Sequence, residues 1–493
     1  MKSTQPVLDR TSVVDSNFKQ ALTNLHFPPA KDTSTLRDID LNQAKCLDIF
    51  DSQLVSRHLD LLARRLKETG AAFYTIGSSG HENNAVLGHV FGIEDMAFLH
   101  YRSGAFMIQR SKQLKGQPKD SNSIIKDNIL SLMAAKEDPI SSGRHKVFGS
   151  LALNVPPQTS TIASHLPKSV GAAYGLTKAK ELGLKDKKIR NLVLCSFGDA
   201  SFNHACTQTS LNSAQFIAHN HYPLPLLFIC EDNGIGISVP TPSDWIQSNV
   251  QGRPGLHYIQ ANGLSMADTY RAAKEAEHIL RDRQEPVFLH LKTVRLMGHA
   301  GSDIESVYRS QIEIEKTESD DPLIHNAKLL IDAGYATPKA LAQRYDNTRR
   351  LVDSEAEKLS GKLGLQSVAE IKASILPAPN QKQQPHLPTI EARQETFGKG
   401  WSQLGKPRNL NQHINAALTD LMLQYSNAII LGEDIGAKGG VYNVTSGLQK
   451  RFGQRRVMDT ILDETTILGM AIGMSAQGLL PIPEIQFLAY THN

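Results

Sequence analysis

Between residues 169 and 294 the chain alternates short apolar runs with longer amphipathic stretches. The apolar runs are NLVLCSF, LPLLFIC and PVFLHLKTV, and SLNSAQFIAHN and ADTYRAAKEAEHIL lie between them. Short apolar runs bounded by turn residues are typical of strands buried on both faces, and the intervening stretches are long enough for crossover helices. The pattern predicts an α/β fold in which parallel sheets are flanked by helices.

Other segments differ in periodicity and composition. After residue 35, apolar positions recur at helical spacing and predict one long amphipathic helix, whose inner face carries Leu47, Phe50, Leu54, Leu59, Leu62 and Leu66. Residues 375–394 are rich in Pro and Gln, which is typical of a linker. We therefore predict four segments: an N-terminal arm (1–35) that docks on a partner subunit or frays, a large domain (36–374), a linker (375–408) and a second domain (409–493).

The ends of two predicted strands carry candidate metal ligands. Asp199 follows the run that ends in CSF, whereas Asn233 and Ile235 follow the run LPLLFIC. Carboxyl ends of parallel strands lie along one edge of a sheet, where ligands bind. Magnesium prefers a few hard oxygen ligands and lets phosphates complete its octahedron. The Asp199 carboxylate, the Asn233 amide and the Ile235 carbonyl are therefore a candidate Mg²⁺ site.

The residues around Asp199 suggest a place for a diphosphate. Gly198 ends the predicted strand, and the backbone N–H groups of Ala200 and Ser201 open the predicted helix. The N-terminus of a helix offers free N–H donors and a partial positive charge to phosphate oxygens. An ordinary strand-turn-helix with Gly-Asp in its turn is the alternative for the dipeptide taken alone.

Gly-Asp-Ala, followed after residues 201–231 by Asp232-Asn233-Gly234, resembles the thiamin diphosphate motif. That motif usually has Gly in place of Ala200, Asn in place of Asp232 and a slightly shorter spacing. EDNGIGIS further resembles the decarboxylating first component of the 2-oxo acid dehydrogenase complexes. We therefore expect the thiamin diphosphate-binding fold, with a transketolase-like diphosphate domain and a partial pyrimidine domain.

Three further segments of the first half resemble this family. HYRSG contains the Tyr101-Arg102 pair expected to contact the diphosphate, and TIASHLP places the backbone carbonyl of Ile162 against the aminopyrimidine. RLMGHAGSDIESVYR resembles the family's mobile loop, with His299 as its active-site histidine. Ala300 stands where many relatives carry a phosphorylatable serine, so kinase control at this position is not expected.

The segment after the linker resembles the opening of the family's beta subunit, so alpha-like (36–374) and beta-like (409–493) parts are fused. Glu464 in ILDETT takes the position of the glutamate that bonds the cofactor's pyrimidine ring. A helix-opening acid is the alternative role for Glu464. A complete beta part extends beyond Asn493, and we expect the chain to be a fragment or a truncated form of a longer enzyme.

The resemblance implies oxidative decarboxylation of a 2-oxo acid, with thiamin diphosphate and Mg²⁺ as cofactors. Glu464 and His299 are then catalytic, and the acyl group passes to lipoyl-lysine of the acyltransferase component, with the fused chain acting as a homodimer. SHLP and EDNGIGIS favour branched-chain acids such as 3-methyl-2-oxobutanoate, and pyruvate or acetoin are alternatives. Transketolase-like carbon transfer and an inactive truncated fragment are two further alternatives.

Composition narrows the function classes. The net charge of +4 is small for 493 residues, and no basic run interleaves with aromatics, so nucleic-acid binding is not expected. No apolar stretch approaches the roughly 20 residues that cross a bilayer, and four scattered cysteines without CxxC pairs favour a cytoplasmic location. His81 lies where the family has Gln or His near the active-site entrance, and its role stays open.

Overall fold

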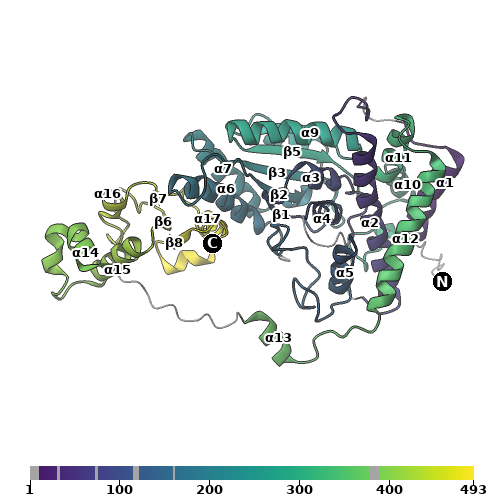
Figure 1. Cartoon of the computed structure of the whole chain (residues 1–493). Helices are drawn as coiled ribbons and strands as arrows, with labels where there is room; N and C mark the ends of the chain where they lie inside the picture. Colours follow the sequence, from purple (N-terminus) through teal and green to yellow (C-terminus); the bar gives the residue numbers. More distant parts are fainter. Residues whose placement is uncertain (1–9, 30–33, 73–75, 115–120, 159–160, 377–387) are drawn as a thin grey trace.

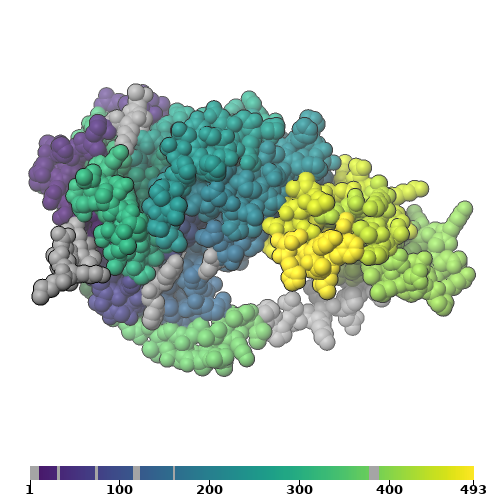
Figure 2. Space-filling model, turned by 180° about the vertical axis from the view of Figure 1, so that it is seen from behind, coloured from purple at the N-terminus to yellow at the C-terminus, as the bar shows by residue number. Residues whose placement is uncertain are grey.

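The computed structural model describes residues 10–29, 34–72, 76–114, 121–158, 161–376 and 388–493. The chain forms a large α/β body and a smaller C-terminal lobe beside it (Figure 1). In Figure 2 the yellow C-terminal lobe contacts one side of the blue and teal body. No helix within these ranges combines the length and the apolar character that crossing a membrane requires.

The body contains a parallel sheet, as the alternating pattern predicted. Its strands lie in the order β1-β2-β3-β5-β4, and every neighbouring pair is parallel. Their bounds are Met96–Phe98 (β1), Val193–Gly198 (β2), Leu226–Asp232 (β3), His257–Asn262 (β4) and Val287–Lys292 (β5). The sequence analysis did not predict β1 and β4, because β1 has only three residues and β4 reads HYIQAN, with polar residues at both ends.

Helices cover both faces of this sheet. One face packs against α6 (His165–Glu181), α7 (Ala205–His219) and α8 (Trp245–Val250). The opposite face packs against α2 (Gln43–Glu68), α4 (Gly104–Ser111), α5 (Ser121–Leu132) and α9 (Met266–His278). Helix α2 confirms the long amphipathic helix expected after residue 35, with its middle turns buried.

Further helices close the body away from the sheet. They are α1 (Arg10–Asn24), α3 (Asn84–Val90), the π-helix η2 (Ile279–Arg283), the 3₁₀ turn η3 (Glu305–Val307), α10 (Gln311–Ser319), α11 (Pro322–Asp332), α12 (Pro338–Leu359) and α13 (Val368–Ile375). Within the expected N-terminal arm, α1 packs on its own chain: Phe18 is fully buried and stacks on Tyr345 of α12 at 4.5 Å between ring centroids. Helix α1 therefore packs against its own chain, because its apolar side is covered by α12.

The C-terminal lobe has a second parallel sheet, in the order β7-β6-β8. Its elements are α14 (Ile390–Phe397), η4 (Gly398–Gln403), α15 (Leu410–Gln424), β6 (Ala428–Gly432), α16 (Leu448–Phe452), β7 (Val457–Asp459), α17 (Glu464–Ser475), β8 (Leu480–Glu484) and η5 (Leu488–His492). Helix α14 belongs to the stretch expected as linker. It is joined to α15 by an ion pair between Arg393 and Asp420, 2.8 Å apart.

Body and lobe meet where α6 and α17 pack together through glycines. A Cβ atom on Gly473 would lie 2.0 Å from the carbonyl oxygen of Lys168, and one on Gly469 would lie 2.2 Å from the side chain of Pro167. Further along, Gly175 faces Met474. Residues further along α17 contact residues further along α6. The two helices therefore run parallel, and their N-termini lie at the same end.

We expect Gly473→Val to separate the lobe from the body, because the added side chain overlaps the backbone of α6. The substitution should lower the free energy of unfolding by about 3 kcal/mol. Scanning calorimetry should show the lobe unfolding in its own transition, below that of the body. Gly405→Val is the matched control, since no atom lies within 4 Å of a Cβ at that position. Equal transition temperatures for the two variants contradict the prediction.

Candidate active site

Asp199 lies directly beyond β2 and is almost completely buried. The hydroxyl of Thr241 donates a hydrogen bond to its carboxylate, and the backbone N–H of Asn233 lies 3.4 Å from Oδ1. No ion pair of the described residues includes Asp199. Burial, with a smaller contribution from the nearby Asp232, raises the pKa of Asp199 to about 6 against the lowering effect of the Thr241 hydrogen bond. A buried carboxylate that has no ion pair can serve as a ligand for a cation.

The helix expected to open at Ala200 and Ser201 is a short 3₁₀ turn, η1 (Asp199–Asn203). Helix α7 begins later, at Ala205, because His204 has an extended backbone and its side chain caps the helix by accepting from Cys206 N. The backbone N–H groups after Gly198 therefore belong to a tight turn and not to the first turn of an α-helix.

Asn233 and Ile235 lie in the turn after β3, beside Asp199. Gly234, with a φ of +75°, lets the chain reverse there, and Ile235 forms an isolated antiparallel bridge with Pro240. The N–H of Ile235 lies 3.3 Å from Oδ1 of Asn233. Asp199 and Asn233 thus lie side by side at one edge of the sheet, and Ile235 follows in the same turn.

Asp232, the extra carboxylate of this motif, is held by bases next to it. His290 Nε2 lies 2.8 Å from its carboxylate and Lys292 Nζ lies 3.3 Å away. Burial by itself raises the pKa of Asp232, but the hydrogen bond and charge of His290 and the charge of Lys292 hold it below the usual value. This carboxylate is therefore compensated within the sheet.

Tyr101, Arg102 and His299 form a second group. The buried guanidinium of Arg102 donates to the carbonyl oxygens of Gly77 at 2.6 Å and of His299 at 3.2 Å, and lies 5.0 Å from the centroid of the Tyr101 ring. Its Nε has no partner among the described residues. Burial, Arg102 and Arg295 lower the pKa of His299 to about 4, so its imidazole is neutral at pH 7.

The loop that carries His299 is fixed by Asp303, which belongs to the same loop, and by Arg295. Asp303 accepts a hydrogen bond from the backbone N of His299 at 2.6 Å and another from the hydroxyl of Tyr308. The buried Arg295 donates to the carbonyl oxygen of Gly236 at 2.6 Å, in the loop after β3. Arg295 therefore ties the His299 loop to the loop of the predicted metal ligands.

A cavity of about 780 Å³ brings most of the predicted cofactor contacts together. Its lining includes Tyr101, Ile162, Ala200, Ser201 and His299, which come from loops that are far apart in sequence. Gly198 lies deeper, where a Cβ would approach His100 Nε2 to 3.2 Å. The volume falls in the range of pockets for drug-sized ligands.

Lys146 also lines this cavity and was missed by the sequence analysis. Its Nζ lies 3.4 Å from the carbonyl oxygen of Ile76 and 4.5 Å from the centroid of the Phe148 ring. Burial lowers the pKa of Lys146 to about 8. The segment GRHKVFG carries no periodic signal that marks this lysine as a pocket residue.

Glu464 is the first residue of α17, is buried, and is not among the residues that line the cavity. The preceding Asp463 is the N-cap of that helix, because it accepts from the backbone N of Thr466 at 2.7 Å and also binds the hydroxyl of Thr209 on α7. Helices α6 and α17 run parallel, so Glu464, at the start of α17, lies at the same end as the start of α6. Ile162 shortly precedes α6 in the sequence.

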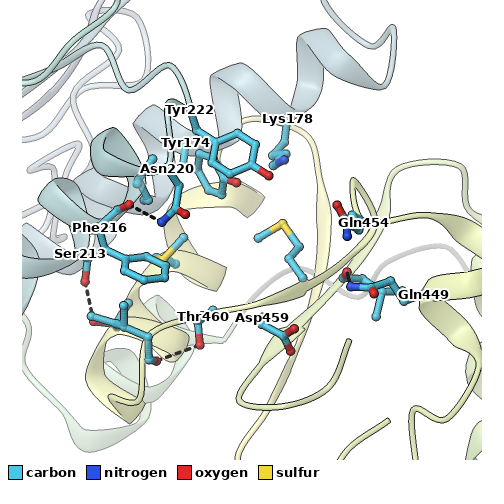
Figure 3. Close-up of a pocket in the computed structure, with 16 residues that line it drawn as sticks. Tyr174, Lys178, Ser213, Phe216, Asn220, Tyr222, Gln449, Gln454, Asp459 and Thr460 are labelled. Carbon is cyan, nitrogen blue, oxygen red and sulfur yellow. Dashed lines mark hydrogen bonds between the residues drawn. The ribbon is translucent and has the colours of Figure 1, made fainter. Parts of the chain in front are cut away.

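A second, smaller cavity of about 240 Å³ lies between body and lobe (Figure 3). Lys178 of α6 stands between the rings of Tyr174 and Tyr222, 4.9 Å from each centroid, and also pairs with Glu181. The lobe contributes residues such as Asp459 on the other side. This cavity contains none of the predicted site residues, so we treat it as a junction between the two parts.

Comparisons with known proteins assign both parts of the chain. The sequence family described as "Dehydrogenase E1 component" matches residues 51–364, and "Transketolase, pyrimidine binding domain" matches residues 406–492. The alpha subunit of 2-oxoisovalerate dehydrogenase from Bacillus subtilis (strain 168) is 24% identical over 335 residues, which cover 66% of this chain and 94% of that subunit.

The end of the chain is similar to beta subunits. The beta subunit of 3-methyl-2-oxobutanoate dehydrogenase from Mycobacterium tuberculosis (strain CDC 1551 / Oshkosh) is 39% identical over 98 residues, covering 20% of this chain and 28% of that subunit. The beta subunit of the pyruvate dehydrogenase E1 component from Staphylococcus epidermidis (strain ATCC 35984) is 46% identical over 81 residues, covering 16% of this chain and 25% of the subunit. The chain thus spans only about a quarter of the length of these beta-type relatives.

We expect Asp199→Asn to stabilise the cofactor-free protein at high pH. The pKa of Asp199 rises from its ordinary 3.8 to about 6 on folding, so the folded state keeps this proton where the unfolded state has lost it. Stability is therefore lost as the pH rises from 3.8 through 6. Removing the charge should raise the free energy of unfolding by up to about 3 kcal/mol at pH 8.

The measurement is denaturant unfolding of both proteins at pH 8 and at pH 4, where the difference should vanish. Asp186→Asn, at an exposed position, is the control. An Asp199→Asn variant that is less stable than the wild type at pH 8 contradicts the prediction.

Proposed function

The chain belongs to the dehydrogenase E1 component family, and on this premise we propose that it binds thiamin diphosphate with Mg²⁺ and decarboxylates a 2-oxo acid. The observation that carries the proposal is that Asp199 contacts Asn233 and Arg102 contacts His299 in loops at one edge of the body's sheet. His299 and the residues that follow Asp199, Ala200 and Ser201, line one cavity of about 780 Å³. A fold alone does not fix function, but donors of this chemistry at this edge support it.

The buried residues fit Mg²⁺. Asp199 is a buried carboxylate without an ion pair among the described residues, and Asn233 and Ile235 offer an amide and a carbonyl oxygen in the adjacent turn. We assign these three groups as the metal ligands, because Mg²⁺ takes few protein oxygens and leaves positions for phosphate. A bound cation would offset the free-energy cost of burying the Asp199 charge.

The diphosphate would be held by cationic and backbone donors. Arg102 keeps an unpartnered Nε among the described residues, and a guanidinium forms strong hydrogen bonds with phosphate oxygens. We propose that Tyr101 and the backbone around Gly198, Ala200 and Ser201 also donate hydrogen bonds to the diphosphate. His299 is neutral and lies beside Arg102, so it can accept or donate a proton at the mouth of the cavity.

We assign Glu464 the hydrogen bond to the cofactor's pyrimidine ring and Ile162 a backbone contact to the same ring. When bound, thiamin diphosphate supplies the carbanion and electron sink for decarboxylation. The chain's own part is to orient the ring from both halves, to hold the metal and to exclude water from the cavity. The parallel packing of α6 and α17 supports a shared site, since it brings the starts of both helices to one end.

We propose a branched-chain substrate such as 3-methyl-2-oxobutanoate, as in branched-chain amino acid catabolism. The names of the Bacillus subtilis and Mycobacterium tuberculosis relatives support this choice. Pyruvate is the second candidate because of the Staphylococcus epidermidis relative. We further propose acyl transfer to a lipoylated acyltransferase component, assembly as a homodimer, and a cytoplasmic location, the last supported by four unpaired cysteines.

We also propose the division of the chain into an arm (1–35), an alpha-like domain (36–374), a linker (375–408) and a partial beta-like domain (409–493). The two family matches, to residues 51–364 and 406–492, support the two larger units. The alternative is that this chain is inactive by itself. Cofactor binding without turnover of any 2-oxo acid is the result that favours this alternative.

The proposal is tested by calorimetric titration of the chain with thiamin diphosphate and Mg²⁺. We expect binding that is lost in Asp199→Ala and weakened about tenfold or more in Glu464→Ala, because each variant loses one contact to the cofactor. Glu391→Ala, an exposed position on α14, is the control. Absence of binding by the wild-type chain contradicts the proposal, and turnover of several 2-oxo acids with an artificial electron acceptor ranks the substrates.

A further inference from the structure

His81 is buried beside the predicted metal ligands, and no role has so far been assigned to it. It lies in the loop between α2 and α3. Its backbone N–H donates to Ser78 O at 2.8 Å. The same loop is pressed against the chain after β5, since a Cβ on Gly80 would come within 2.0 Å of the carbonyl oxygen of Val294. The backbone around His81 is therefore held in place, and this limits where its ring can lie.

Glu231 determines which nitrogen of His81 carries the proton. His81 Nδ1 lies 2.5 Å from the Glu231 carboxylate, which also receives the amide of Asn84 at 3.1 Å and faces His100 Nδ1 at 3.4 Å. The amide of Asn84 donates to the same oxygen, so this oxygen is an acceptor and Nδ1 of His81 is the donor.

The backbone N–H of Ile235 donates to Oδ1 of Asn233, so the NH₂ end of this amide faces His81 Nε2, which must accept. A neutral imidazole with its proton on Nδ1 offers a lone pair on Nε2. Asn233 Nδ2 lies 3.2 Å from this Nε2. The amide group of Asn233 therefore donates to His81, and its oxygen turns the other way, toward the backbone N–H of Ile235 at 3.3 Å.

We propose that His81 is a positioning residue for the metal site: held by Glu231, it orients the Asn233 amide so that the oxygen, and not the NH₂ group, is presented to the cation. The inference rests on the proposed function for the identity of the cation. A reversed amide would place an NH₂ group against Mg²⁺ and an oxygen against the lone pair of His81 Nε2. Groups that orient metal ligands in this way typically contribute about 10- to 100-fold to metal affinity.

The test is the Mg²⁺ concentration that gives half-maximal thiamin diphosphate binding in His81→Leu and His81→Gln. Leucine has no acceptor, so His81→Leu should raise this concentration about 10- to 100-fold. Glutamine has both a donor for Glu231 and an acceptor for Asn233, so His81→Gln should stay within about threefold of wild type. His58→Leu, the same change at a buried histidine of α2 that packs against Tyr345, should leave this Mg²⁺ concentration unchanged.

A purely structural role for His81 predicts that affinity follows stability, and the melting temperature of each variant is therefore measured as well. The inference is overturned if His81→Leu binds Mg²⁺ like the wild type, or if His81→Gln is impaired as strongly as His81→Leu.

A second measurement does not depend on cofactor binding. Nitrogen NMR of ¹⁵N-histidine-labelled, cofactor-free protein, with His81→Gln used for assignment, should show the neutral tautomer with its proton on Nδ1. A proton on Nε2 overturns the inference. A wild-type chain that fails to bind the cofactor but shows the Nδ1 tautomer refutes the proposed function alone.

Discussion

The parallel register of β2, β3 and β5 is the constraint on which the candidate site depends. Gly198 pairs with Glu231, and Asp232 pairs with Lys292, so the three strands end almost level. The loops that follow them carry Asp199, Asn233 and His299, and polar backbone groups are free at this edge because the strands end there. Arg295 then ties two of these loops together. Backbone pairing thus brings loops that are up to 100 positions apart in sequence to one edge of the sheet.

Successive side chains along β3 and its following turn point to opposite sides. This places Glu231, Asp232 and Asn233 in two different environments. Glu231 faces His81 and His100, whereas Asp232 faces His290 of β5 and Lys292, because successive side chains of a strand point to opposite faces. Asn233 again lies on the His81 side. The two buried carboxylates are therefore each compensated by their own histidines, whereas the neighbouring Asp199 has a raised pKa and no ion pair among the described residues.

Much of this arrangement could be predicted from the sequence. Strong apolar periodicity identified α2, β2, β3 and β5, and the edge rule then brought Asp199, Asn233 and His299 together. Short or polar elements such as β1 and β4 lack that signal, since a three-residue strand has no pattern. The partners Arg295, Asp303, Lys146 and the Glu231–His81 contact come from loops or from tertiary packing, and no local spacing encodes which loop faces which. The helix expected at Ala200 became a 3₁₀ turn because His204 caps α7 one turn later.

The glycine faces of α6 and α17 extend the same edge into the C-terminal lobe. Helix α6 precedes β2 and runs antiparallel to it, and His165 at its start lies 2.8 Å from the carbonyl oxygen of Ser196 near the end of that strand. Because α17 runs parallel to α6, its first residue, Glu464, lies toward the carboxyl ends of the body's strands as well. Side chains larger than hydrogen at Gly469 or Gly473 would force the helices apart. The absence of these side chains therefore allows α17 to lie directly against α6, with its first residue at the same end as the start of α6.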